Sequence, residues 1–371
     1  MPTRKYTVRI KPTPQQGKLL WQYAGTRRFV WNWAIETIKK WHESGEKLDW
    51  NRLSREFTQL RNDTDWLKSM NYKATRGALY DVKIAMKAFF RRVKSGEKPG
   101  FPRFKSRSDP HQGFFIPEKA RVEINRLVYM RQRFRLMRML PGCEVGGAVR
   151  IKHVAGKWYA SFTITSPDVD LRKIEPTNLV GIDIGLKDYA ILSDGTKIAN
   201  PRFFRQMERK LSHWQRKLAR QKKGSNRRLR TKQRIAKIHA GIANRRKHFA
   251  HLQSRRIADG FDAACIESHS LKAQAQGRLA KSVHDVGHAA FRRNLAYKLP
   301  DRGKQLIEAE QFFASTKTCS SCGGRNNAIT LSTRKWTCDE CGAAHDRDLN
   351  AAKNLEAYGR EQVAADALNQ T

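Results

Sequence analysis

The chain has 371 residues, enough for two or three domains that each bury a hydrophobic core. It carries 74 Lys and Arg against 34 Asp and Glu, a formal net charge of +40, and a protein with this imbalance repels itself unless a polyanion neutralises it. Nucleic acid is the expected polyanion, because ribosomal and histone-like chains are usually shorter and poorer in aromatic residues and no lipidation motif favours a membrane surface.

The sequence also predicts where the protein works. No apolar run is long enough to span a membrane, and the first residues lack the apolar core of a signal peptide. We therefore expect a protein of the reducing cytoplasm with no membrane partner. In that setting, the Cys-x-x-Cys pairs that hold four of the six cysteines predict metal binding rather than disulfides.

The first hundred residues predict a strand followed by helices. Residues 5–11 alternate polar and apolar side chains, and apolar residues then recur at helical spacing over residues 19–41, 51–60 and 73–93. The outer faces of these helices are basic. They can be an ordinary solvated surface, but the net charge favours a nucleic-acid face. The candidate contacts on the first and third helices are Arg27, Arg28, Lys73 and Arg76.

Residues 98–107, KPGFPRFKSR, mix aromatic and cationic side chains with Pro and Gly. This composition suits base stacking with phosphate contact, for which Arg103 and Lys105 are candidates, and it equally suits a rigid connector. The sequence leaves both interpretations open. Residues 112–165 predict five short strands, which form a small β-barrel with the N-terminal strand and make the helices an insertion.

A new domain begins near residue 179, after a polar linker at residues 167–177. Its first hairpin places Asp183 inside a buried strand, where an acid is either bonded to the backbone or held by a partner or metal; both readings stay open. Residues 201–256 predict a helical hairpin with one apolar seam, twenty Lys and Arg, and a single acidic residue, Glu208. Charge of one sign predicts phosphate contact.

The rest of this domain alternates strands and helices. A short apolar strand ends at Glu267, a helix covers residues 282–299, and another strand covers residues 304–313. A final helix holds Asp346 and Asp348 in its first turn. The last dozen residues predict a flexible tail.

The two Cys-x-x-Cys pairs stand fifteen residues apart, the spacing of a four-thiolate zinc ribbon. Gly323 and Gly342 follow the pairs, where each tight turn needs an unhindered backbone. Four protein ligands close the site, so the zinc is structural and staples a loop without a core of its own. His345 is a weaker alternative ligand. The expected ligands are Cys319, Cys322, Cys338 and Cys341.

Three acidic residues, Asp183, Glu267 and Asp348, stand at strand ends or at a helix start of this domain. Carboxylates on separate elements can converge at one edge of a sheet and bind Mg²⁺. Two such ions, about 4 Å apart, can activate water and stabilise the leaving 3′ oxygen of a phosphodiester. Three unrelated acids are the default alternative. The order hairpin, long helix, strand, helix, strand, helix favours an RNase H-like nuclease fold.

Nearly the whole chain resembles the TnpB family, the compact RNA-guided nucleases of insertion sequences, which are related to type V CRISPR effectors. YTVRIKPTPQQ, GTRRFVWNWA, GFPRFKSR, GIDIG, the basic hairpin, the zinc ribbon and DRDLNAAKN occur in the family's order. GIDIG, the ribbon and DRDLNAAKN are specific together and weak singly. The strand with Glu267 continues with Ser268-His269-Ser270, where the family usually has an acidic residue and Leu-Asn.

The resemblance implies that Asp183, Glu267 and Asp348 form a RuvC-like catalytic triad that holds Mg²⁺, as two ions. Asp348 is chosen over Asp346 because the family's aspartate lies two residues before the first Asn, here Asn350. The resemblance also implies a guide RNA from the right end of the element and a double-stranded DNA target cut next to a short transposon-adjacent motif. The ribonucleoprotein would be a monomer in a bacterial or archaeal cytoplasm, associated with the nucleoid when bound to DNA.

The expected fold is therefore α+β and multidomain, with a helical recognition subdomain inserted in a small barrel and a RuvC-like α/β nuclease domain that carries an inserted zinc ribbon. The expected boundaries are 1–11 and 108–170 for the wedge-like β-barrel, 12–107 for the recognition subdomain, 178–318 and 342–359 for the nuclease domain, 319–341 for the zinc ribbon and 360–371 for the tail.

The leading hypothesis is an RNA-guided, Mg²⁺-dependent DNA endonuclease, in which base pairing selects the sequence and the protein reads a short flanking motif. A nuclease-inactive RNA-guided DNA-binding regulator is one alternative, although the intact triad argues against it. A metal-dependent strand-transfer transposase is another, because it would share the three carboxylates. A general RNA-binding protein leaves the placement of the acids unexplained.

Overall fold

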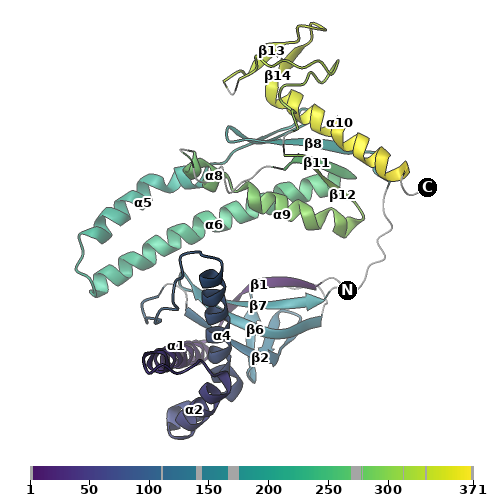
Figure 1. Cartoon of the computed structure of the whole chain (residues 1–371). Coiled ribbons are helices and arrows are strands. Elements are labelled where there is room, and N and C mark those ends of the chain that lie inside the picture. Colours follow the sequence, from purple (N-terminus) through teal and green to yellow (C-terminus); the bar gives the residue numbers. More distant parts are fainter. Residues whose placement is uncertain are drawn as a thin grey trace. The chain divides into compact units, whose positions relative to one another are not determined.

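The computed structural model describes residues 3–109, 112–138, 144–165, 175–268, 277, 279–311, 313–330 and 332–368 (Figure 1). The chain divides into two units, residues 1–169 and 170–371, each with its own sheet and core. The expected linker at 167–177 falls at this division, and its residues up to 174 lie outside the described part. None of the described helices is long and apolar enough to cross a membrane.

The first unit is built on a seven-stranded sheet with the order β2-β6-β7-β1-β5-β4-β3. The N-terminal strand lies inside this sheet, antiparallel to β7 and β5, so the helices interrupt the sheet in the sequence. The described ladders do not join β2 to β3, and closure into a barrel stays a prediction. Within the described residues of this unit, six strands follow the helices, one more than expected. The strands are β1 Thr3–Lys11, β2 Gln112–Lys119, β3 Arg121–Glu123, β4 Arg126–Tyr129, β5 Gln132–Leu136, β6 Glu144–Val154 and β7 Lys157–Thr165.

Four helices lie between β1 and β2, where the sequence predicts three. The additional helix, α3, is four residues long, too short to show a helical period. The long first helix starts at a capping box, in which the Thr13 side chain accepts from the Gln16 amide and the Gln16 side chain accepts from the Thr13 amide. The helices are α1 Pro14–Glu43, α2 Trp50–Asn62, α3 Asp65–Lys68 and α4 Tyr72–Lys94.

A buried ion pair joins the helices to the sheet of the first unit. Asp81 on α4 is 9% exposed, and its carboxylate lies 2.6 Å from Arg27 Nη2 and 3.1 Å from Arg150 Nη2 of β6. Arg27 Nη1 also donates to the Gly113 carbonyl of β2 at 3.1 Å. Removal of one partner of such a pair leaves an uncompensated buried charge. Arg27 and Asp81 therefore hold α1, α4 and the sheet together.

The second unit contains a five-stranded sheet with the order β10-β9-β8-β11-β12. The first three strands in sequence form an antiparallel meander, and β11 is parallel to both β8 and β12. A parallel neighbour requires a long crossover, which two helices supply here. The strands are β8 Leu179–Ile184, β9 Asp188–Leu192, β10 Lys197–Ala199, β11 Ala263–Glu267 and β12 Gln305–Ala309.

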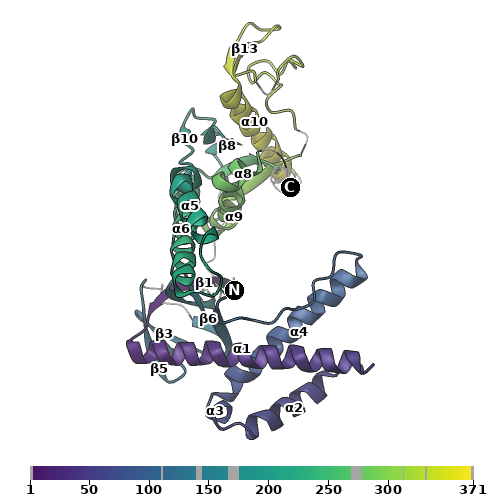
Figure 2. The same ribbon diagram turned by 90° about the vertical axis from the view of Figure 1, so that its left-hand side faces the viewer.

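Helices cover both faces of this sheet (Figure 1). On one face, Val180 and Ile182 of β8 share a core with Ile257 of α6 and Leu295 of α9. On the other face, Leu179 packs with Leu355 of the last helix. The first two helices run side by side as the predicted basic hairpin (Figure 2). The helices are α5 Phe203–Ala219, α6 Asn226–Gly260, α8 Ala280–Val286, α9 His288–Lys298 and α10 Arg347–Leu368.

Three expected boundaries in the second unit are corrected. The helix predicted over residues 282–299 is two helices, because Gly287 has a φ of +72° that breaks the α-helical hydrogen bonds. The strand predicted over residues 304–313 ends at Ala309. The final helix continues to Leu368, so most of the expected flexible tail at 360–371 is helical. Periodicity alone does not locate such ends.

Candidate active site and metal centre

Asp183 and Glu267 lie at the carboxyl ends of the neighbouring parallel strands β8 and β11. The register pairs Ile182 with Ile266, and the two acids are the next residues along each strand. Side chains alternate between faces, and adjacent strands lie about 4.8 Å apart. Both carboxylates therefore lie on the face opposite the two isoleucines. That is the face covered by α10.

The packing of α10 on β8 shows how the helix is aligned with the strand. A Cβ on Gly359 would lie 3.1 Å from the Leu179 side chain, so the late part of the helix lies over the start of the strand. A Cβ on Gly181 would lie 1.9 Å from the Ala352 carbonyl oxygen, so the helix backbone touches the strand at its middle. The strand and the helix therefore run in opposite directions, and the carboxyl end of β8 lies near the start of α10.

This alignment leads to Asp348. Two residues of a strand span about 6.6 Å, and four residues of a helix span about 6 Å. The step from Gly181 to Asp183 therefore corresponds to the step from Ala352 back to Asp348. The first turn of α10 lies near the strand ends that carry Asp183 and Glu267, on the same face of the sheet.

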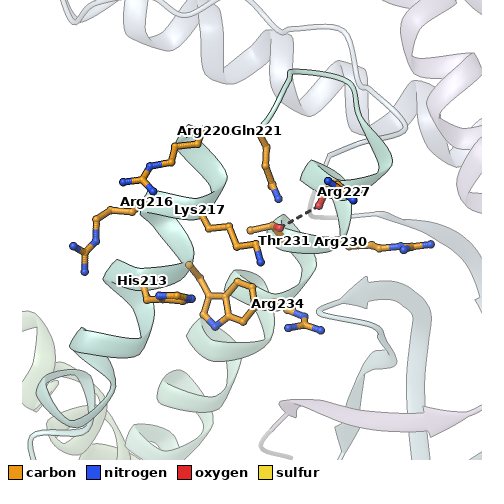
Figure 3. A pocket seen from close by; sticks show the side chains of 10 residues that line it. His213, Arg216, Lys217, Arg220, Gln221, Arg227, Arg230, Thr231 and Arg234 are labelled. Carbon is orange, nitrogen blue, oxygen red and sulfur yellow. Dashed lines mark hydrogen bonds between the residues drawn. The ribbon is translucent and has the colours of Figure 1, made fainter.

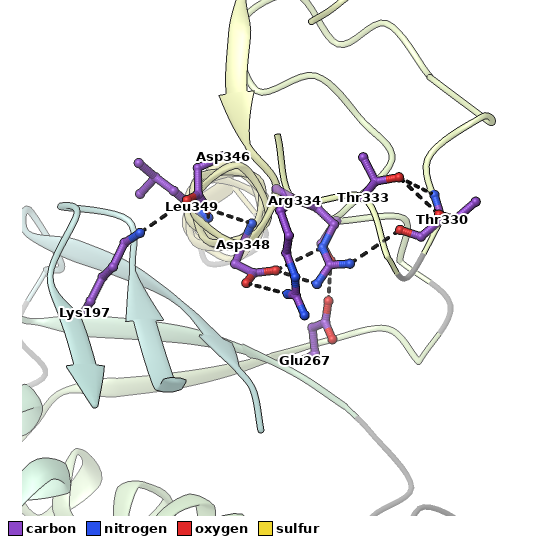
Figure 4. A network of polar contacts seen from close by, with 10 residues as sticks. Lys197, Glu267, Thr330, Thr333, Arg334, Asp346, Asp348 and Leu349 are labelled. Atoms are coloured by element: carbon purple, nitrogen blue, oxygen red, sulfur yellow. Dashed lines mark hydrogen bonds and ion pairs between the residues drawn. The ribbon is translucent and has the colours of Figure 1, made fainter. Parts of the chain in front are cut away.

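Two arginines hold the Asp348 carboxylate (Figure 4). Arg334 Nη1 lies 3.2 Å from Oδ2, while Arg347 Nη2 and Nε lie 2.7 Å and 2.9 Å from Oδ1. Glu267, which is 9% exposed, points toward this pair from β11 and accepts a hydrogen bond from the Ser315 hydroxyl. Both guanidinium groups offset the negative charge gathered at this end of the sheet.

Asp346 has a different task from Asp348. Its Oδ1 accepts hydrogen bonds from the Asp348 and Leu349 amides at 3.1 and 3.2 Å, so it caps the start of α10, and its Oδ2 lies 3.2 Å from Lys197 Nζ. Burial opposes ionisation, but the Leu349 amide and Lys197 hold the pKa of Asp346 below its ordinary value. The Asp346 carboxylate therefore caps the start of α10.

The four cysteines of the predicted zinc site come together. Their sulfurs lie within 4.8 Å of one another, with 3.7 Å between Cys319 and Cys341 and between Cys322 and Cys338. A tetrahedral zinc with bonds of about 2.3 Å separates its sulfurs by about 3.8 Å, so the residues fit this metal. Among the described residues this is the only group of three or more ligand atoms gathered closely enough for one ion.

The backbone turns that present these cysteines have the predicted form. Gly323 and Gly342 have φ of +82° and +71°, and their amides donate to the Cys319 and Cys338 carbonyls at 2.9 Å. Burial opposes ionisation of Cys319, but hydrogen bonds from the Cys322 and Ser321 amides and from His345 lower its pKa to about 6. The thiolate form of Cys319 is therefore favoured. His345 Nε2 lies 3.0 Å from this sulfur.

Two buried asparagines tie the cysteine site to α10. Asn350 Oδ1 accepts from the Ser320 amide at 2.9 Å, and its Nδ2 donates to the Thr318 carbonyl at 2.7 Å. Asn354, one turn later, donates to the Ser315 and Thr318 carbonyls, both at 2.7 Å. The asparagines of DRDLNAAKN therefore anchor the first cysteine turn to the helix that carries Asp348.

The predicted nucleic-acid contacts fall into two groups. Lys73, Arg76 and Arg103 are exposed. The side chain of Arg27, in contrast, is only 15% exposed and forms an ion pair with Asp81. Lys105 lies with Nζ 3.5 Å from the Trp31 ring centroid, and burial, followed by the nearby Arg27, lowers its pKa to about 8.

Arg28 belongs with the second group. It is half-buried, and its Nη1 donates to Gln112 Oε1 at 3.0 Å. Sequence reasoning also missed Arg334 and Arg347 as partners of Asp348. The pairing of Arg347 with Asp348 could have been predicted, because the two residues are adjacent in the sequence. No pattern in the sequence predicts the pairing of Arg334 with that carboxylate.

Three family profiles match the sequence. One described as "Probable transposase" matches residues 162–273, one described as "Cas12f1-like, TNB domain" matches residues 288–355, and one described as "Helix-turn-helix domain" matches residues 1–47. Together they cover parts of both units.

Known proteins resemble the chain over nearly its whole length. A candidate RNA-guided DNA endonuclease of Streptomyces pristinaespiralis is 30% identical over 96% of this chain and 89% of that protein. InsQ of Escherichia coli, also named as a candidate RNA-guided DNA endonuclease, is 29% identical over 99% of this chain and 94% of its own length. The Cas12f1 chain of a solved complex with single-guide RNA and target DNA has a TM-score of 0.55, at 14% identity over 93% of this chain and 83% of that chain, which shows a shared fold.

Proposed function

Because the chain belongs to the TnpB family, we propose that it is an RNA-guided DNA endonuclease of an insertion sequence, which cleaves double-stranded DNA next to a short transposon-adjacent motif. One observation carries the assignment of its active site. Asp183 and Glu267 occupy adjacent strand ends on the face covered by α10, and the alignment of that helix leads to Asp348.

Under this proposal, Asp183, Glu267 and Asp348 supply the carboxylate oxygens for Mg²⁺, as two ions. Mg²⁺ held there would supply Lewis-acid chemistry for hydrolysis of the phosphodiester, in which water attacks phosphorus and the 3′ oxygen leaves, so that the products carry a 5′-phosphate and a 3′-hydroxyl. Arg334 and Arg347 pair with Asp348 when no cation neutralises it. If Asp348 held a metal instead, each guanidinium would be available to pair with a phosphate of the DNA.

The sheet topology supports the assignment of a nuclease domain to the second unit. The strand order is β10-β9-β8-β11-β12, with antiparallel ladders between β10 and β9 and between β9 and β8, and parallel ladders between β8 and β11 and between β11 and β12. This topology is that expected of an RNase H-like (RuvC) domain. We assign residues 178–318 and 342–359 to the nuclease domain and residues 319–341 to a structural zinc ribbon inserted before its last catalytic element. In the first unit, residues 12–107 form the recognition subdomain, inserted in the wedge-like barrel of 1–11 and 108–170.

The proposed partners are a guide RNA from the right end of the element and a double-stranded DNA target. The charge of +40 fits the binding of both. We propose that the ribonucleoprotein contains one copy of the chain. It works in a bacterial or archaeal cytoplasm, on the nucleoid when bound to DNA.

We expect the protein, purified from cells that carry its element, to retain one discrete RNA whose sequence maps to the right end of the element. The measurement is sequencing of the nucleic acid extracted after a high-salt wash, since non-specific contacts weaken steeply with salt. A heterogeneous mixture of cellular RNA would instead favour a general RNA-binding protein. If the discrete RNA is present and DNA is bound but never cut in Mg²⁺, the regulator is the better reading, and joined strands would indicate a transposase.

A further inference from the structure

The tip of the α5–α6 hairpin contains a cavity of about 910 Å³ (Figure 3). Lys217 and Gln221 reach across it toward Thr231 of α6. None of the described residues that line the cavity is acidic. Its cationic lining residues are Arg216, Lys217, Arg220, Arg227, Arg230 and Arg234.

Among the described residues, no carboxylate forms an ion pair with these cations. In the described parts of the chain, Arg216, Arg220 and Arg230 have no ion-pair partner. Glu208, the acid of α5, is already paired with Arg205 and Lys281, and Asp259, near the far end of α6, is paired with Arg255 and Arg302. Cations crowded around a hollow repel one another, so the cavity favours an anionic occupant.

Arg228, also at the tip of the hairpin, has a structural role. Arg228 Nη1 donates to the Leu218 and Gln221 carbonyls and thereby closes the hairpin. Thr231, which is 4% exposed, donates its hydroxyl to the Arg227 carbonyl at 3.1 Å. The cations that line the cavity are not required for this closure.

The cavity also contains an aromatic ring, which a site for phosphate alone would not need. Arg234 Cζ lies 4.7 Å and Lys217 Nζ 5.3 Å from the Trp214 ring centroid, and His213 meets this ring edge-on at 5.3 Å. An indole ring among cations is the combination that holds single-stranded nucleic acid, through base stacking together with phosphate contact.

We propose that this cavity binds an unpaired nucleotide of a nucleic-acid strand, with its base against Trp214 and its phosphates among the surrounding arginines. The volume is far larger than a phosphate needs and lies within the range of about 300–1,000 Å³ of small-molecule sites. A stacked base takes the place of Lys217 or Arg234 on the ring, and the displaced cation pairs with the phosphate. The inference rests on the proposed function only in taking the ligand to be RNA or DNA.

The test compares an eight-nucleotide single strand with the same strand carrying one central abasic site, each made as RNA and as DNA, by fluorescence anisotropy on the full-length protein stripped of nucleic acid. For the strand that the cavity accepts, we expect the abasic site to weaken binding by about 10-fold, the worth of one stacked base. Trp214→Ala should weaken binding of the intact strand by the same factor and show no further loss with the abasic strand.

Two variants serve as controls. Trp214→Phe retains an aromatic face and should keep most of the affinity, which separates stacking from a folding defect. Lys237→Ala removes an exposed cation of α6 outside the cavity and should weaken the intact and abasic strands equally. The arm that responds identifies the strand as RNA or DNA.

Equal affinity of the wild-type protein for intact and abasic strands in both arms would overturn the proposal. So would a Trp214→Ala loss that is the same for intact and abasic strands. Neither result depends on cleavage, because strand binding is measured without Mg²⁺. A failure of the nuclease assignment therefore remains distinguishable from a failure of the cavity assignment.

Discussion

We expect Asp183→Ala to abolish DNA cleavage by the guide-RNA complex, with a loss of at least about 10³-fold in rate, while RNA and target binding persist. The variant removes a carboxylate from the strand end where three acids are proposed to hold the metal, and a catalytic metal contributes several kcal/mol to transition-state stabilisation. The measurement is single-turnover cleavage of a labelled duplex in Mg²⁺, with binding followed in parallel by gel shift.

The matched control for this variant is Asp194→Ala. Asp194 lies in the turn between β9 and β10 of the same antiparallel meander, is exposed, and bonds only the Thr196 amide of its own turn among the contacts described for it. It changes the net charge equally and should leave cleavage near the wild-type rate. If Asp183→Ala cuts as fast as the wild type, the assignment of the catalytic carboxylates is wrong.

The second large effect is expected for Cys338→Ser, which should remove the zinc and reduce cleavage by about 10–100-fold. Cys338 is buried, and its sulfur lies 3.7 Å from Cys322. Without the metal, the ribbon retains only a small core. When the metal is lost, Arg334 and the first cysteine turn become mobile. The first turn of α10 then loses the ion pair between Arg334 and Asp348 and the hydrogen bonds of Asn350.

Three readouts separate the outcomes for Cys338→Ser: zinc content by elemental analysis, thermal unfolding and cleavage rate. Cys265→Ala is the control, because Cys265 is buried in β11 and is not among the grouped cysteines. It should retain one zinc per chain. Full cleavage by a zinc-free Cys338→Ser protein would show that the ribbon is dispensable for the reaction.

The grouping of the four cysteines can be predicted from the sequence because its determinants are local. Ligand spacing and the glycine after each pair define the two turns, and the structure confirms that the four sulfurs meet. The strand that ends at Glu267 and the helix start at Asp348 were also readable, since apolar runs and first-turn acids are local signals. That Glu267 and Asp348 lie near each other depends on the order of the strands in the sheet. A single sequence suggests this order but does not determine it.

Other features depend on contacts between distant residues. Arg27 looked like a nucleic-acid contact because an exposed arginine and one buried against Asp81 are identical in the sequence. Arg334 reaches Asp348 only because the ribbon folds back on α10. The cavity around Trp214 requires two helices to face each other, and helical periodicity alone does not specify which side chains then line the space between them.

The central claim is that base pairing with a bound RNA directs a cut made by the carboxylate site. The most direct measurement uses one protein preparation with two guide RNAs that differ only in the guide segment, on two plasmids that carry the matching targets and the same flanking motif. We expect each complex to linearise only its matched plasmid, in Mg²⁺ and not in EDTA. Cutting of both plasmids by either complex, or of neither under any divalent cation, would contradict it.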